Sequence, residues 1–180
     1  MKITTRRTGL AAAAALAMGV LVAGTQLANA APPPPPVPQE IAVPAGNTLA
    51  GKAAAQGFQI YTCQAGGWVL QQPMAVLLGT DRKPFALHYG GPTWMAMDGS
   101  AVVGARAGIA PAPTPGAIPL LLLSTTPANG STVGALTGIT FIQRLNTTGG
   151  VAPATGCDAD HLGATAPVPY TADYYFFRAA

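Results

Sequence analysis

The stretch His88–Ser100 holds most of the residue types that could carry chemistry in this 180-residue sequence. It contains one of the two histidines and one of the two tryptophans, Trp94. A histidine base, an acid and a serine are the parts of a hydrolytic triad, so His88, Asp98 and Ser100 suggest one. Ser100 does not lie in a GxSxG elbow, however, and the sequence around it fits turn chemistry better. We therefore assign no catalytic residue.

Aromatic residues give the same stretch a second interpretation. Exposed Tyr and Trp rings stack on the apolar faces of sugars and peptides, while polar neighbours bind the hydroxyl or amide groups. Tyr89 and Trp94, together with Trp68 and Tyr61, would suit such a platform, and burial of the same rings in the core is the alternative. We predict a non-catalytic binding module for a sugar or peptide surface. Its candidate ligand-binding residues are His88, Tyr89, Trp94, Asp98 and Ser100.

A weaker pattern suggests a metal site. Asp158, Asp160 and His161 lie close together in the sequence, and with His88 they would offer the carboxylate and imidazole ligands that suit zinc or a harder cation. The same spacing is common in solvated loops, so the sequence assigns no metal and no cofactor. Two alternative functions stay open. One is a metal-dependent or hydrolytic secreted enzyme that uses these residues, and the other is a purely structural surface protein.

The N-terminus predicts export. A basic start precedes an apolar run over residues 10–23, and Ala28-Asn29-Ala30 is a small-x-small cleavage site. We expect cleavage after Ala30 and no transmembrane segment afterwards, because the run is short and rich in alanine. Arg6-Arg7 resembles a twin-arginine signal, but Gly9 replaces the usual Phe and general secretion fits better. We expect a periplasmic or extracellular protein, from a bacterium rather than a fungus.

Removal of the predicted signal peptide, residues 1–30, changes the charge of the protein. The chain has nine Lys and Arg against six Asp and Glu, and three of the nine cations but no acid precede residue 31. Nine minus three leaves six of each sign, so the net charge is zero and offers no attraction to nucleic acid. Residues 31–38 form a proline-rich linker, expected to be an extended polyproline helix. Residues 39–180 form a single β domain.

From residue 58 onward the sequence predicts β-strands. Short alternating or apolar runs are separated by Gly, Pro and Asp turns, and no amphipathic helix is evident. Before that point residues 41–43 suggest a short strand and residues 52–56 a helical turn. We expect an all-β fold, an antiparallel β-sandwich or flattened barrel of about eight to nine short strands. The predicted strands are 58–63, 68–70, 74–78, 85–89, 93–97, 101–107, 120–123, 139–145 and 170–177.

Two further pairings are predicted from the residues. An even number of cysteines in an exported chain predicts a disulfide between Cys63 and Cys157, and two free thiols are the alternative. The link would close a loop of 94 residues, 157 minus 63, and would tie the first strong strand to the loop before the last one. Arg144 and Asp173 are predicted to form an ion pair between late strands.

Several short motifs are specific in combination: Ile60-Tyr61-Thr62-Cys63, His88-Tyr89-Gly90-Gly91-Pro92-Thr93-Trp94, Asn146-Thr147-Thr148-Gly149-Gly150 and Val168-Pro169-Tyr170-Thr171-Ala172-Asp173-Tyr174. With them, residues 57–177 resemble a secreted bacterial and fungal family known only as a domain of unknown function. The resemblance implies a β fold, export and paired cysteines, but no activity. Some fungal members are labelled malate dehydrogenase. This sequence does not support that label, because it has no GxGxxG after a strand and no βαβ pattern.

Overall fold

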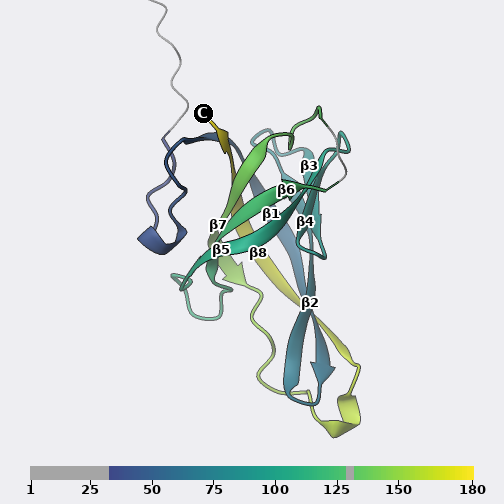
Figure 1. Cartoon of the computed structure of the whole chain (residues 1–180). Coiled ribbons are helices and arrows are strands. Elements are labelled where there is room, and N and C mark those ends of the chain that lie inside the picture. The colour runs from purple at the N-terminus through teal and green to yellow at the C-terminus, as the bar shows by residue number, and fades with distance from the viewer. Residues whose placement is uncertain (1–32, 129–131) are drawn as a thin grey trace, which may run out of the picture. The chain divides into compact units, whose positions relative to one another are not determined.

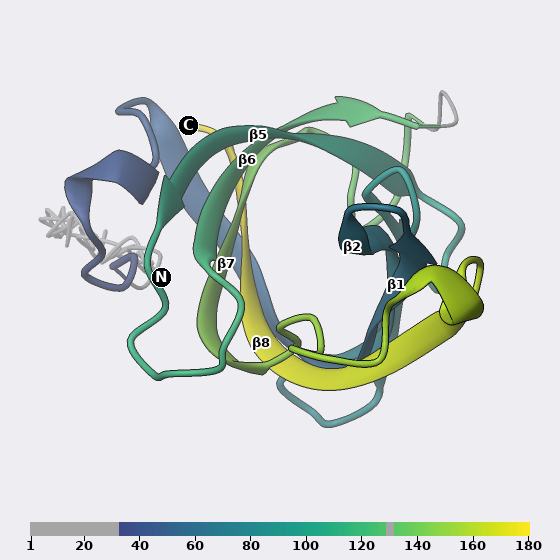
Figure 2. The same ribbon diagram turned by 90° about the horizontal axis from the view of Figure 1, so that it is seen from below.

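The computed structural model describes residues 33–128 and 132–180, so the predicted signal peptide lies outside the described residues. Eight antiparallel strands form one sheet that closes into a barrel, in which each strand pairs with the next and β8 returns to β1 (Figure 1). Figure 2 shows the strands following one another around a ring. The all-β prediction is confirmed, in its barrel form. The strands are β1 (Asn47–Gln64), β2 (Gly67–Leu78), β3 (Pro84–Tyr89), β4 (Thr93–Ala96), β5 (Ala101–Ala110), β6 (Leu120–Pro127), β7 (Ile139–Gly149) and β8 (Thr165–Ala179).

Helical structure is limited to two short 3-10 turns in the described residues, η1 (Gln39–Ile41) and η2 (Ala159–His161). Within the same residues, no helix is long and apolar enough to cross a membrane. Residues 33–38, the described part of the predicted linker, form neither a helix nor a strand.

The first strands are longer than the sequence predicted. β1 begins at Asn47, so the helical turn expected at residues 52–56 is wrong and these residues are extended. β2 runs through Pro73, where the prediction separated two strands. The length of β1 has a structural reason, because this strand pairs with β8 on one side over residues 47–62 and with β2 on the other over residues 54–64. It is therefore the strand that closes the barrel.

The interior of the barrel combines small side chains with large ones. Small residues, most of them from β1 to β4, leave room for Trp94 of β4 and for the large residues of β7 and β8, as suits the limited space inside a narrow barrel. Gly104 of β5 belongs to the same arrangement, since a Cβ at this position would lie 2.8 Å from the Trp94 ring. The small residues include Ala53, Ala55, Ala75, Ala86 and Ala96, and the large ones include Trp94, Ile142, Tyr170, Tyr174 and Phe176.

The segment before β1, which includes Val37, Ile41 and Val43, covers the outside of the barrel over β5 to β7. We call it the N-terminal segment. Ile41 of η1 is fully buried there and packs in one cluster with Leu120, Leu122 and Leu145. The side-chain amide of Gln143 donates a hydrogen bond of 2.7 Å to the Ile41 carbonyl. This cover explains why residues 120–123 are apolar on both faces. Alternate leucines of β6 face the interior, and the others face the segment.

The predicted disulfide is present at one end of the barrel. Cys63 of β1 is linked to Cys157, which lies in the loop before β8. Two backbone hydrogen bonds join the same segments, from Cys63 N–H to the Ala164 carbonyl (2.8 Å) and from Gly163 N–H to the Cys63 carbonyl (2.9 Å). The loop of residues 150–164 is thereby fixed onto the β1–β2 hairpin. We call this part of the molecule the hairpin end.

Candidate functional site

The stretch His88–Ser100 does not form one surface. His88 and Trp94 face the barrel interior and are 3% and 1% exposed, whereas Tyr89 faces outward and is 38% exposed. Asp98 and Ser100 lie in the turn between β4 and β5. Successive residues of a strand point to opposite sides of a sheet, so the predicted binding residues divide among three separate places.

His88 and Trp94 form the centre of an aromatic cluster inside the barrel. They lie opposite each other on β3 and β4, and their rings stack with centroids 4.1 Å apart and planes inclined by 10°. Tyr174 of β8 meets both rings edge-on, at 5.3 Å from His88 and 5.5 Å from Trp94. His88 Nδ1 lies 2.9 Å from the Thr93 carbonyl oxygen. A carbonyl only accepts, so Nδ1 carries the proton of the neutral ring and Nε2 keeps the lone pair.

Burial controls the charge of His88. Loss of hydration is the main reason that the pKa of this imidazole is lowered from 6.5 to about 3; the hydrogen bond with Thr93 opposes this shift, and the nearby positive charge of Arg144 adds to it. The ring is therefore neutral at physiological pH. A neutral, stacked imidazole whose Nδ1–H is held by the backbone is suited to packing and hydrogen bonding rather than to holding a positive charge.

This burial predicts an acid-sensitive contribution to stability. An unfolded chain protonates His88 below pH 6.5, whereas the folded protein does not until about pH 3. Acidification between these values therefore favours unfolding, with a slope of about 1.4 kcal/mol per pH unit from this group. Urea unfolding between about pH 6.5 and pH 4.5 should show the slope in the wild type, and His88→Gln should remove it. His161→Gln, at the exposed histidine, is the control. Equal acid sensitivity of wild type and His88→Gln would contradict this account.

Arg144 lies inside the barrel and not in the ion pair that the sequence predicted. Asp173 instead pairs with Lys52 at 2.9 Å and accepts a hydrogen bond from Asn146, on the outside of the sheet. Arg144 lies directly opposite Tyr174 on the neighbouring strand, and its Nε and Nη2 donate to the Pro119 carbonyl at 3.2 and 2.8 Å. The prediction failed because Asp173 and Tyr174 are adjacent on β8 and therefore point to opposite sides of the sheet. Arg144 faces the interior with Tyr174, whereas Asp173 points outward.

Several polar atoms of the barrel interior are buried without a hydrogen-bond partner. They are Nε2 of Gln59, Nε1 of Trp94, and the hydroxyls of Tyr170 and Tyr174. The two hydroxyls and the Arg144 guanidinium are close enough to influence the pKa of Tyr174, although no contact there has the geometry of a full hydrogen bond. Burial raises the pKa of both tyrosines, so both hydroxyls stay protonated. Unsatisfied buried polar groups are rare in folded proteins and indicate strain or a missing partner.

Tyr89 belongs to an apolar area on the outside of β1 to β3, which we call the groove face. Strand pairing places Phe58 opposite Met74 and Val76 opposite Leu87. These side chains line a groove of about 300 Å³ together with Tyr89 and backbone of neighbouring residues. Their exposed fractions lie between 37% and 54%. The groove face therefore presents large apolar side chains that no described part of the chain covers.

A glycine shapes the floor of this groove. Gly57 of β1 approaches the β2 backbone so closely that a Cβ would collide with the Met74 carbonyl oxygen and the Ala75 Cα. This close approach lies where Gly57 pairs with Ala75, between Phe58 and Val76 of the groove. Glycine is required here for space, because any side chain would push the strands apart.

Asp98 and Ser100 hold a loop. Asp98 Oδ1 accepts from the Ser100 backbone N–H (2.9 Å) and hydroxyl (2.6 Å), while Oδ2 accepts from Ala135 N–H (2.7 Å). The Ser100 oxygen accepts in turn from Leu136 N–H at 3.0 Å. These bonds, the Ser100 hydroxyl first among them, lower the pKa of the Asp98 carboxyl. Ser100 thus faces a carboxylate and backbone amides, and no histidine base lies in its hydrogen-bonding shell.

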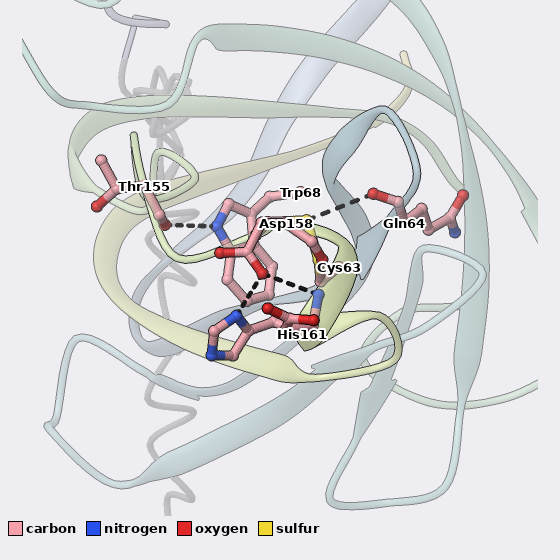
Figure 3. A network of polar contacts seen from close by, with 8 residues as sticks. Cys63, Gln64, Trp68, Thr155, Asp158 and His161 are labelled. Carbon is pink, nitrogen blue, oxygen red and sulfur yellow. Dashed lines mark hydrogen bonds and ion pairs between the residues drawn. A yellow bond between two sulfur atoms is a disulfide. The ribbon is translucent and has the colours of Figure 1, made fainter.

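Asp158 and His161, two residues of the weak metal pattern, lie at the hairpin end (Figure 3). His161 Nδ1 is 2.6 Å from Asp158 Oδ1, and both side chains are exposed. The His161 hydrogen bond is the main reason that the pKa of Asp158 is lowered. In the same view Trp68 Nε1 donates to the Thr155 carbonyl at 2.9 Å. Asp160 joins this contact only through its backbone N–H, which donates to Asp158 Oδ1 at 3.0 Å, and His88 does not join it. The described residues contain no group of three or more His, Cys, Asp or Glu that could hold a metal ion.

The fold and these sites define a class: a disulfide-linked, eight-stranded antiparallel β-barrel with a polar and aromatic interior and an apolar outer groove. The chain belongs to the family described as "Protein of unknown function (DUF3455)", whose model matches residues 44–178. This confirms the family resemblance noted in the sequence. No curated protein and no solved structure matches the chain.

Proposed function

We propose that the protein is an exported, non-catalytic binding domain of the cell envelope or extracellular space. It binds an apolar peptide segment through the groove face. The observation that carries this proposal is the uncovered apolar surface of Phe58, Met74, Val76, Leu87 and Tyr89 around one groove. Large exposed apolar patches on a folded domain mark interaction sites.

A comparison of the two sides of the barrel supports the proposal. The outward leucines of β6 are covered by the chain's own N-terminal segment, with Ile41 at the centre. The outward apolar residues of β2 and β3 have no such cover among the described residues. Methionine at the centre of the patch favours a peptide over a sugar, because a flexible thioether adapts to varied apolar side chains. Export is supported by the predicted cleavage site after Ala30 and by the disulfide, which persists in oxidising compartments.

Selection from a displayed library of random peptides tests this function. We expect apolar sequences to be enriched and Met74→Glu to weaken their binding at least about tenfold, because a charge would be desolvated in the groove. Leu70→Glu is the matched control, since Leu70 lies on the same strand and is 49% exposed against 54% for Met74, but does not line the groove. Peptides that bind both variants equally well would overturn the proposal.

A further inference from the structure

We propose that the barrel interior also contains a binding site for a small carboxylate anion, centred on the Arg144 guanidinium. Arg144 lies between Leu121 of β6 and Tyr174 of β8 on the inner face of the sheet. Unpartnered polar groups of Trp94, Tyr170 and Tyr174 belong to the main core cluster of the same interior. Gln59, which also has an unpartnered group, is buried on the side of β1 that carries Ala53 and Ala55. This site is separate from the groove face, which lies on the outside of the barrel.

The charge balance of the interior points to an anion. All six carboxylates of the chain lie in its described part, and none of them is within ion-pair distance of Arg144. The nearest strand acid, Asp173, points outward to Lys52. The guanidinium is partly buried and donates its hydrogen bonds to a neutral group, the Pro119 carbonyl, so its charge has no counter-charge in the described residues. An anionic ligand would supply the missing counter-charge.

The unpartnered atoms define what kind of anion fits. Nε2 of Gln59 and Nε1 of Trp94 are donors only, and the hydroxyls of Tyr170 and Tyr174 keep their protons. A carboxylate has only acceptor atoms and can take several such donors together with a guanidinium. All four donor residues are at least nine-tenths buried. Buried donors beside a guanidinium are the chemical complement of an oxyanion.

Packing limits the size of the ligand and the direction of its entry. The rings of Trp94, Tyr170 and Tyr174 are part of the main core cluster and occupy much of the interior. We therefore assign a ligand of a few atoms, such as a short monocarboxylate. Arg144 is only partly buried, whereas the donors are fully buried, so the ligand would enter from the Arg144 side.

The indole N–H of Trp94 gives a direct readout of the site. In a ¹⁵N-resolved spectrum of the whole protein, with Trp68→Phe used to assign the two indole signals, acetate is added at constant ionic strength against chloride. We expect a saturable shift of the Trp94 signal with a dissociation constant on the order of 1 mM, as suits so small a ligand. Arg144→Gln should weaken binding at least about tenfold and Tyr170→Phe about threefold. Arg106→Gln, an exposed arginine of β5, should leave it unchanged.

Two of these variants separate binding from a purely structural role. Tyr170→Phe removes one hydroxyl without changing the shape of the core, so weaker acetate binding in a fully folded variant identifies that hydroxyl as a ligand donor. Near-ultraviolet circular dichroism checks the fold of each variant. The proposal is overturned if acetate gives no saturable shift, if chloride gives the same shift, or if folded Arg144→Gln and Tyr170→Phe both bind acetate as the wild type does.

Discussion

Breaking the Cys63–Cys157 disulfide is expected to lower the free energy of unfolding by about 4–5 kcal/mol. The link joins residues 94 apart in the sequence, so it restricts the unfolded chain over most of the barrel. In the chain-entropy description the disulfide lowers the conformational entropy of the unfolded chain. Removing the link restores that entropy and so stabilises the unfolded state. A small domain has only about 5–15 kcal/mol of stability in total, so this is one of the largest single contributions.

Urea unfolding of the wild type and of Cys63→Ala/Cys157→Ala measures this effect. The denaturant dependence should steepen in the variant, because an unlinked unfolded chain exposes more surface. Trp68→Phe is the control at the same end of the barrel. It removes the hydrogen bond to the Thr155 carbonyl and part of the indole ring while keeping the disulfide, and we expect it to cost about 1 kcal/mol. A double variant no less stable than Trp68→Phe would show that the hairpin end is held by its local hydrogen bonds and not by the covalent link.

The fold class followed from the sequence because its signals are local. Turns and alternating apolar runs are set by residues close together in the sequence, and they indicated an antiparallel all-β domain. The disulfide was predicted from the even number of cysteines and from the oxidising compartment that the signal peptide implied. The extent of β1 was not predictable in this way. Residues 47–57 are rich in alanine and glycine, which favour no strand by themselves, and they are extended because β8 pairs with them.

The site was harder to predict because it depends on which side of each strand faces inward. Alternation along a strand places Tyr170 and Tyr174 on one side of β8, and Arg144 and Gln143 on opposite sides of β7. It did not show that Gln143 faces the N-terminal segment and Arg144 the interior, since both sides of β7 are covered. A charged residue that faces the interior of a barrel contradicts the usual rule that cores are apolar, so the sequence indicated a partner for Arg144, an ion pair with Asp173 between late strands. The chemistry of the interior became visible only when the strands were placed around the barrel.

Replacing Trp94 by alanine is expected to cost about 3–5 kcal/mol of stability. Trp94 is 1% exposed and is the largest side chain in the interior, where much of the surrounding wall is alanine or glycine. The closed ring of hydrogen-bonded strands cannot collapse into the space that the indole leaves, so the full cavity cost applies. His88 and Tyr174 would also lose the ring against which they pack. Trp94→Phe should cost clearly less, because it keeps an aromatic ring beside His88.

A second substitution shows whether the cost arises from the cavity. Gly104 faces the same ring, and a methyl group there would lie 2.8 Å from the Trp94 Cζ3 atom, so Gly104→Ala should destabilise the wild type by about 1–3 kcal/mol through overpacking. In the Trp94→Ala background the same methyl group enters vacant space and should instead restore part of the lost stability. Thermal and urea unfolding are measured for the wild type, Trp94→Ala, Gly104→Ala and the double variant. We expect the double variant to be more stable, by about 2 kcal/mol or more, than the sum of the two single effects predicts. Additive effects would mean that the barrel wall moves inward when the indole is removed, and that the interior is more deformable than its closed hydrogen bonding implies.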